Sequence, residues 1–248
     1  MPATPAWPPK SAPRLFVAET LAAGAALQIE GNPAHYLARV MRVAPGDIVI
    51  LCDDVTGEWA ARVADVGKRD VVLDVAEMLR PREAVPDLWL CPALLKKDRF
   101  DFVLEKATEL GAARIQPLVT RRCVADKLNI ERARAITIEA AEQCARTALP
   151  ELGEPLKLDA LLASWPGGRA LFFADENGGE PAAQAFAANI GFPAAILTGP
   201  EGGFDEAERA AIRAHRAARP ITLGPRILRG ETAAIAAVAV WMACAGDW

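Results

Sequence analysis

The chain has 248 residues, 52 % of them apolar, and a formal net charge of −4. This length allows one large domain or two small ones, and the apolar fraction is ample for a hydrophobic core. The acidic balance excludes a uniformly basic nucleic-acid-binding protein, so any RNA contact requires clustered lysines and arginines. Five cysteines without C-x-x-C spacing and only two histidines predict reduced, mostly buried thiols in a cytoplasmic protein, with no metal site.

Residues 1–13 contain five prolines and are expected to form a disordered tail. Residues 14–80 carry short β-rich runs at 15–17, 47–51, 58–63 and 71–75, separated by turn signals at 56–57 and 67–70. This pattern predicts a small β-barrel domain, with a short helix at 35–43. The proline-flanked segment 81–87 is the expected linker.

Strands and helices alternate in the second domain, residues 88–248. The expected strands are 88–95, 114–120, 170–174, 194–198 and 221–223, and the expected helices are 100–110, 130–149, 181–190, 205–218 and 231–245. Such alternation predicts an α/β fold with a parallel sheet covered on both faces. The last helix is apolar almost all round, but it is too short to span a membrane. The sequence predicts neither a signal peptide nor a membrane span.

Two glycine-rich loops follow neighbouring strands near the C-terminus, at 196–204 and 223–234. Open α/β sheets bind ligands at the carboxyl ends of their strands. Glu201 lies between the glycines of the first loop and would repel a polyphosphate, and neither a P-loop nor a dinucleotide fingerprint is present. A ligand with an adenosine group and a cationic centre, such as S-adenosylmethionine, fits these loops better.

The motifs GPEGGF (199–204) and LGPRILRGETA (223–233) resemble the C-terminal signatures of the RsmE family. Further resemblance lies in LLKKDR (94–99), KATELG (106–111), EAAEQCAR (139–146), and HYLARVMR (35–42) with PGD (45–47). It therefore covers roughly residues 14–245. The departures are few: Met41, Cys144 and Gly230 replace a usual Leu, Ser and Thr.

The resemblance implies an SPOUT-type α/β knot, meaning a parallel sheet with a C-terminal trefoil knot, preceded by a PUA-like RNA-binding domain. It also implies S-adenosylmethionine-dependent methylation of N3 of a specific uridine in 16S ribosomal RNA, on the small ribosomal subunit. The apolar helix 231–245 needs cover on most of its sides. The family buries this helix at a two-fold interface, which implies a homodimer.

The predicted site residues fall into three groups. Arg229 is expected to stabilise negative charge on the base, with Glu201 and Glu231 as candidate proton acceptors. The expected cofactor-binding residues are Leu197, Thr198, Gly199, Pro200, Glu201, Gly202, Gly203, Leu223, Gly224, Pro225, Ile227, Leu228, Thr232 and Ala233. The expected RNA-binding residues are His35, Arg39, Arg42, Lys96, Lys97, Arg99, Arg121, Arg122 and Arg146.

Simpler interpretations of these residues stay open at this point. The basic side chains could form a solvated rim, and Arg229 and Glu231 could be ordinary helix-end charges. Two other functions compete with uridine methylation: ribose 2′-O-methylation by the same fold, and a non-catalytic RNA-binding factor in ribosome assembly.

Overall fold

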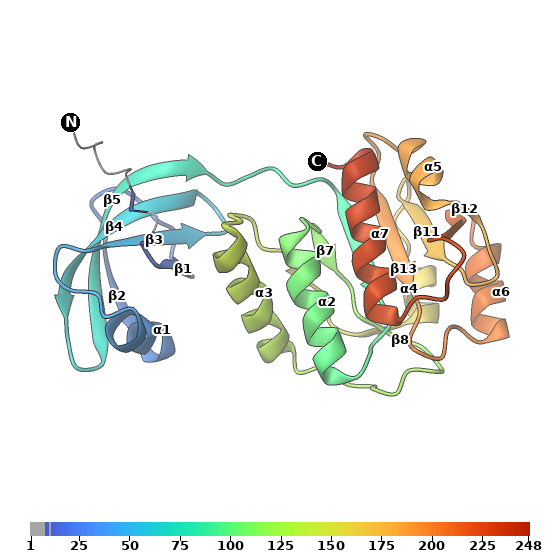
Figure 1. Cartoon of the computed structure of the whole chain (residues 1–248), viewed down its shortest axis with the longest axis horizontal. Coiled ribbons are helices and arrows are strands. Elements are labelled where there is room, and N and C mark those ends of the chain that lie inside the picture. Colours follow the sequence, from blue (N-terminus) through green and yellow to red (C-terminus); the bar gives the residue numbers. More distant parts are fainter. Residues whose placement is uncertain (1–7, 10) are drawn as a thin grey trace. The chain divides into compact units, whose positions relative to one another are not determined.

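The computed structural model describes residues 8–9 and 11–248, so most of the expected tail at 1–13 lies outside the described residues. Contacts divide the chain into two units. The first contains Met1–Ala84 and Ala141–Ala148, and the second contains Val85–Ala140 and Leu149–Trp248. Figure 1 shows the elements of both units along the chain.

The first unit is built on a five-stranded sheet of order β1-β3-β4-β5-β2. Its strands are β1 (Arg14–Phe16), β2 (Ala26–Glu30), β3 (Ile48–Asp53), β4 (Gly57–Val66) and β5 (Asp70–Pro81). The β1–β3 pair is parallel and the other pairs are antiparallel. The expected β-rich domain is confirmed. Within the described residues β1 and β2 do not pair, so closure into a barrel stays a prediction.

The helix of this unit starts earlier than predicted. It consists of α1 (Gly31–His35), continued as a π-helical turn η1 (Tyr36–Val40). Pro33 is tolerated because the amides of the first helical turn have no intrahelical acceptor. Arg42 then takes a left-handed conformation with φ 54°, which ends the helical run before residue 43.

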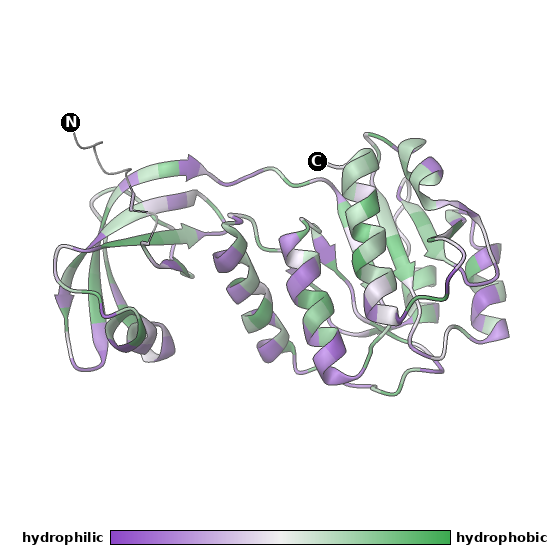
Figure 2. Cartoon of the chain, in the orientation of Figure 1, coloured by the Kyte–Doolittle hydropathy of each residue, from purple (hydrophilic) through white to green (hydrophobic). Residues whose placement is uncertain are grey.

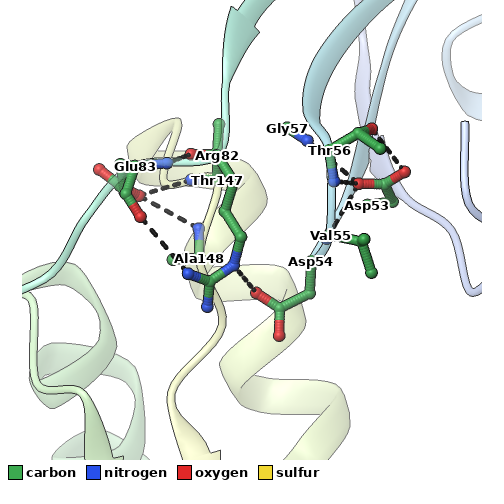
Figure 3. Close-up of polar contacts among 9 residues, drawn as sticks. All are labelled: Asp53, Asp54, Val55, Thr56, Gly57, Arg82, Glu83, Thr147 and Ala148. Atoms are coloured by element: carbon green, nitrogen blue, oxygen red, sulfur yellow. Dashed lines mark hydrogen bonds and ion pairs between the residues drawn. The ribbon is translucent and has the colours of Figure 1, made fainter.

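Residues 141–148 are tied to the end of the first unit's last strand (Figure 3). The Glu83 carboxylate accepts hydrogen bonds from the amides of Thr147 at 2.6 Å and Ala148 at 3.2 Å, and the Thr147 hydroxyl accepts one from the Glu83 amide at 2.9 Å. Arg82 pairs with Asp54 of the same unit at 2.9 Å. The expected linker is therefore partly structured, since β5 extends to Pro81 and Glu83 anchors a distant segment.

The second unit contains a parallel seven-stranded sheet of order β12-β14-β11-β13-β6-β7-β9, which confirms the predicted α/β class. A short parallel pair, β8 with β10, lies outside this sheet. The strands are β6 (Leu88–Pro92), β7 (Arg114–Ile115), β8 (Leu118–Val119), β9 (Glu151–Leu152), β10 (Leu156–Lys157), β11 (Ala170–Ala174), β12 (Glu180–Pro181), β13 (Ala194–Thr198) and β14 (Ala218–Thr222).

The helices of this unit are α2 (Lys97–Glu109), α3 (Ile130–Cys144), α4 (Leu158–Ala163), α5 (Ala182–Ala187), α6 (Glu206–Ala214) and α7 (Gly230–Ala245). The last residues of α3 group with the first unit. The predictions of helices at 130–149 and 205–218 were too long. Ala145, with φ 61°, ends α3 five residues early. The helix α6 ends at Ala214, which frees residues 218–222 to pair as β14.

The C-terminal helix α7 packs against α2, α5 and the strands β6 and β13. It buries Ala234, Ala237, Val238, Trp241 and Met242. Figure 2 shows that it is apolar along most of its length, whereas α6 carries a hydrophilic face. Among the described residues, no helix combines the length and the hydropathy that a membrane crossing requires.

All five cysteines lie in the described part of the chain, and none of them forms a disulfide there. Cys52 and Cys91 are buried, and burial raises the pKa of both thiols to about 12, so they stay protonated at neutral pH. Cys123 and Cys244 are half-buried and Cys144 is exposed, so the expectation of mostly buried thiols holds only in part.

Candidate cofactor pocket and active site

A pocket of about 160 Å³ lies at the carboxyl ends of β11, β13 and β14. The strand β11 pairs with β13 on one side and β14 on the other, so the loops after three adjacent strands form its walls. The residues that line it are Phe173, Ala174, Asp175, Glu176, Thr198, Gly199, Pro200, Gly203, Phe204, Arg209, Ile221, Thr222, Leu223, Gly224, Pro225, Arg226, Ile227, Leu228, Gly230 and Ala233. This is the sheet edge at which the sequence predicts ligand binding.

Most of the predicted cofactor-binding residues lie in this wall. Those that line the pocket are Thr198, Gly199, Pro200, Gly203, Leu223, Gly224, Pro225, Ile227, Leu228 and Ala233. Leu197 is instead fully buried in β13, and Glu201, Gly202 and Thr232 lie outside the lining. The loop after β11 was missed. The sequence feature that could have indicated it is the run Asp175-Glu176-Asn177-Gly178-Gly179, which directly follows a predicted strand.

Two glycines permit the close approach of these loops. Gly203 has φ 65°, and a Cβ there would lie 3.1 Å from Glu176 Oε1. A Cβ at Gly230 would lie 2.8 Å from the Leu95 side chain and 3.2 Å from the Gly199 carbonyl oxygen. The first turn of α7 therefore packs closely against the loop after β13, and Gly230 leaves room for that contact.

Two carboxylates lie beside each other at the end of β11. The Asp175 side chain is 0 % exposed and pairs with Arg209 at 3.3 Å and with Arg213 at 2.6 Å. Its Oδ1 also accepts the Asn177 amide at 3.0 Å. Glu176 is 44 % exposed and accepts a hydrogen bond from Arg209 Nη2 at 2.5 Å. Asp175 therefore fixes the loop, and Glu176 faces the pocket.

The predicted catalytic residues gather at the start of α7 and α2. Arg229 is the N-cap residue of α7, is exposed, and has no ion-pair partner in the part of the chain that the structure describes. Glu201 lies 3.5 Å and Glu231 3.8 Å from the guanidinium of Arg99. Glu231 Oε2 is buried without a hydrogen-bond partner among the described residues. Arg229 and Glu231 Oε2 are therefore open to an interaction partner, beside Gly230, which lines the pocket.

The remaining basic residues of the second unit have different surroundings. Lys96 and Lys97 are exposed at the start of α2. Arg121 pairs with Asp205 at 2.9 Å, and Arg122 donates to the Gly202 carbonyl oxygen at 2.9 Å. These two arginines therefore also anchor the loop after β13, besides being open to solvent.

Arg146 belongs to the first unit and is 5 % exposed. Burial lowers the pKa of its guanidinium, and the nearby Glu83 acts in the opposite direction. A side chain so enclosed is poorly placed for direct contact with an RNA phosphate.

A second pocket, of about 520 Å³, lies within the first unit. It is lined by Gln28, Glu30, Gly31, Ala34, His35, Ala38, Arg39, Gly67, Lys68, Arg69 and Asp70. Two of the predicted RNA-binding residues, His35 and Arg39, are therefore beside Lys68 and Arg69 from the turn before β5. Arg42 is exposed but does not line this pocket.

Family models match both parts of the chain. The model of an RNA methyltransferase domain matches residues 81–242, and that of an RNA methyltransferase PUA domain matches residues 29–76. Ribosomal RNA small subunit methyltransferase E of Rickettsia conorii is 30 % identical over 91 % of this chain and 93 % of its own length. The protein of the same name from Synechocystis is 32 % identical over 91 % of this chain and 76 % of its own length.

Solved structures match over nearly the whole chain. A Legionella pneumophila protein in complex with bound SAM has a TM-score of 0.86 and 29 % identity, covering 96 % of this chain and 99 % of that chain. Ribosomal RNA small subunit methyltransferase E from Neisseria gonorrhoeae, bound to S-adenosyl methionine, has a TM-score of 0.84 and 28 % identity, with the same coverage.

Proposed function

The chain belongs to the RsmE family of RNA methyltransferases, and we propose that it transfers a methyl group from S-adenosylmethionine to N3 of a uridine in small-subunit 16S ribosomal RNA. The observation that carries this proposal is the pocket shared by the loops after β11, β13 and β14. The similar methyltransferase from Neisseria gonorrhoeae, which matches this chain over nearly its whole length, is bound to S-adenosyl methionine. The pocket's mixture of apolar side chains and glycine backbone suits an adenosine group.

The chain's residues suit a displacement at the methyl carbon. In this transfer the uridine N3 would attack the methyl carbon, the carbon–sulfur bond would break to release S-adenosylhomocysteine, and the N3 proton would pass to a base before or during transfer. Catalysis then depends on positioning and charge stabilisation. Arg229 is the residue that we assign to the negative charge developing on the uracil. Glu201 and Glu231 are the proposed proton acceptors, and the buried, unpaired Oε2 of Glu231 favours the latter.

Cofactor contacts are assigned to the predicted residues that line the pocket, and we also assign them to Glu201, Gly202 and Thr232 of the same two loops. Leu197 is fully buried in β13 and is not assigned a contact. In the fold that the resemblance implies, the C-terminal segment passes through a trefoil knot, and we propose that arrangement here. The packing of α7 against β6 and β13 is compatible with it. A cytoplasmic homodimer completes the proposal.

RNA recruitment is assigned to residues 14–80, with His35, Arg39 and Arg42 as contacts, and to Lys96, Lys97, Arg99, Arg121 and Arg122 near the cofactor loops. Arg39→Gln combined with Arg69→Gln removes two cations from the first unit's pocket. We expect this variant to bind small subunits more weakly and with a shallower salt dependence, because fewer counterions are released. Its affinity for cofactor should not change. Unaltered subunit binding would contradict the assignment.

The function is tested by incubating the protein with labelled S-adenosylmethionine and small ribosomal subunits that lack the modification. Nucleoside mass spectrometry of the product should show a methyl group on the uracil base. A methyl group on ribose would favour the 2′-O-methyltransferase alternative. Binding to subunits without any methyl transfer would favour the assembly factor.

A further inference from the structure

Glu176 occupies the middle of the pocket's three-loop wall. It comes directly after β11, and β11 lies between β13 and β14 in the sheet. The loop after β14 carries Leu223, Pro225 and Leu228, an apolar surface that suits a planar base. The loop after β13 forms the opposite wall. A nucleoside-containing ligand that spanned both loops would have its sugar between them, beside the loop after β11.

The Glu176 carboxylate is held in a fixed orientation with spare acceptor capacity. Its Oε1 accepts the hydrogen bond from Arg209 at 2.5 Å, while no residue in the described part of the chain donates to Oε2. Arg209 is itself held by the buried Asp175, whose second partner is Arg213. Gly203 leaves room for the carboxylate, since a Cβ there would lie 3.1 Å from Oε1.

We infer that Glu176 accepts a hydrogen bond from a ribose hydroxyl of the cofactor, with Arg209 as the positioning residue; this rests on the proposed function. An ionised carboxylate only accepts hydrogen bonds, and a ribose hydroxyl can donate one. Such charge-assisted bonds are among the stronger ones. The assignment makes the loop after β11, which has no counterpart among the predicted cofactor residues, the element that recognises the sugar.

The test pairs a change in the protein with a change in the ligand. Calorimetry on the full chain measures the affinity for S-adenosylhomocysteine and for its 2′-deoxy and 3′-deoxy analogues. In the wild type, loss of the contacted hydroxyl should weaken binding about tenfold to a hundredfold, as expected for a hydrogen bond to a charged group. Glu176→Ala should bind S-adenosylhomocysteine more weakly by a similar factor and no longer distinguish the analogues.

Matched variants separate this role from a general effect on the fold. Glu180→Ala removes an exposed glutamate of the same unit and should keep both the affinity and the discrimination. Arg209→Lys keeps the charge but not the planar fork, and should reduce the discrimination between analogues. Glu176→Gln, whose amide oxygen still accepts a hydrogen bond, should retain part of it.

Three outcomes would contradict either the role of Glu176 or the proposed function. Equal losses on removal of the hydroxyl in the wild type and in Glu176→Ala would overturn the inference and leave the proposed function intact. A change confined to the preference for S-adenosylmethionine over S-adenosylhomocysteine, whose sulfur is uncharged, would also overturn it, since Glu176 would then be responding to the sulfonium charge. Failure of the wild type to bind either compound would overturn the proposed function itself.

Discussion

Gly203 is the residue at which the loop after β13 meets the pocket. Its φ of 65° favours glycine, and any side chain there would project toward Glu176. We expect Gly203→Val to weaken S-adenosylmethionine binding by at least about tenfold, because the branched side chain would occupy ligand space. Calorimetry on the variant measures this loss. Gly202 is a less direct target, since a Cβ there would contact Arg122 rather than the pocket.

Gly191→Val is the matched control for Gly203→Val. Gly191 also has a left-handed backbone, φ 79°, but nothing lies within 4 Å of its Cβ position. Both variants carry backbone strain of about 1–3 kcal/mol, and only one fills the pocket. Equal cofactor affinities in the two variants would show that Gly203 serves the turn alone.

Arg229 is exposed and has no ion pair among the described residues, so its charge is available to an anionic substrate group. If it stabilises the uracil anion during transfer, Arg229→Ala should lower single-turnover methylation by about 10²–10³, by analogy with loss of an oxyanion-hole donor. Cofactor affinity should change much less. Arg229→Lys should restore part of the rate, since lysine is a point charge without the planar fork.

Single-turnover methylation at saturating cofactor is the deciding measurement for Arg229. An interaction made in the transition state lowers kcat and kcat/KM together. Near wild-type turnover in Arg229→Ala would identify the residue as a helix-end charge only. Arg122→Ala is a useful comparison, because Arg122 also borders the loop after β13 but donates to its backbone at Gly202.

Among the elements, β4 carries the main buried ion-pair network of the first unit. Glu58 of β4 has a side chain only 6 % exposed and pairs with Arg14 of β1 at 2.5 Å and with Arg80 of β5. Burial alone would raise the pKa of Glu58, but the hydrogen bonds from Arg80 and Arg14 outweigh it and hold the pKa below that of an ordinary glutamate. The network thus links the central strand β4 to the edge strand β1 and to its neighbour β5.

The lowered pKa fixes the sign of the pH dependence. Because Glu58 binds its proton more weakly when folded than when unfolded, its stabilisation is present above pH 4.5 and is lost as the pH falls through the folded pKa. Glu58→Gln should lower the free energy of unfolding by about 1–3 kcal/mol at pH 7, less than for a fully buried pair because both arginines retain water contact. As the pH falls below about 5, the free energy of unfolding should also decrease less in the variant than in the wild type.

Urea unfolding, followed by circular dichroism over the acid range, measures the Glu58 effect. Glu19→Gln serves as the control, because Glu19 is exposed in the same unit and has no ion pair among the described residues. A Glu58→Gln profile that runs parallel to that of the wild type would show that the network contributes nothing to the pH dependence.

The elements also show how far sequence patterns reach. Period-two runs and glycine punctuation predict the β-rich first unit, the parallel sheet and two of the three pocket loops. The C-terminal end of α3 was not predictable, because Ala145 takes a left-handed conformation that no local signal marks. Nor was the grouping of residues 141–148 with the first unit, since it depends on Glu83 contacting Thr147 across 64 positions.

At the scale of the molecule, the division into units limits how the protein can be dissected. A chain that starts near Asp87 would retain residues 141–148 but lose the strand end and Glu83 that bind them. The amides of Thr147 and Ala148 would then lose their acceptor, and Arg146 would lose part of the structure that buries it. Point substitutions in the first unit are therefore a cleaner test of RNA recruitment than truncation.

The last prediction concerns assembly. The helix α7 is apolar nearly all round, yet Ile235, Ala239 and Val240 are only half-buried within one chain. Ile227, on the neighbouring cofactor loop, is 88 % exposed. A second copy that covered this surface would remove apolar area from water, at about 25 cal/mol per Å². We therefore expect a homodimer in sedimentation experiments at micromolar concentration.

Ile235→Glu should shift the protein toward the monomer, because dimer formation would bury an unpaired charge. Phe192→Glu changes another exposed apolar residue, 66 % exposed and outside α7, and should leave the dimer intact. A wild type that sediments as a monomer would contradict the prediction. Equal dissociation of the dimer in both variants would show that the interface is not specific to α7.

Because Ile227 lines the cofactor pocket as well, a dimer built on this surface would also place a second chain beside the bound cofactor. Ile235→Glu should therefore weaken S-adenosylmethionine binding, while Phe192→Glu should not.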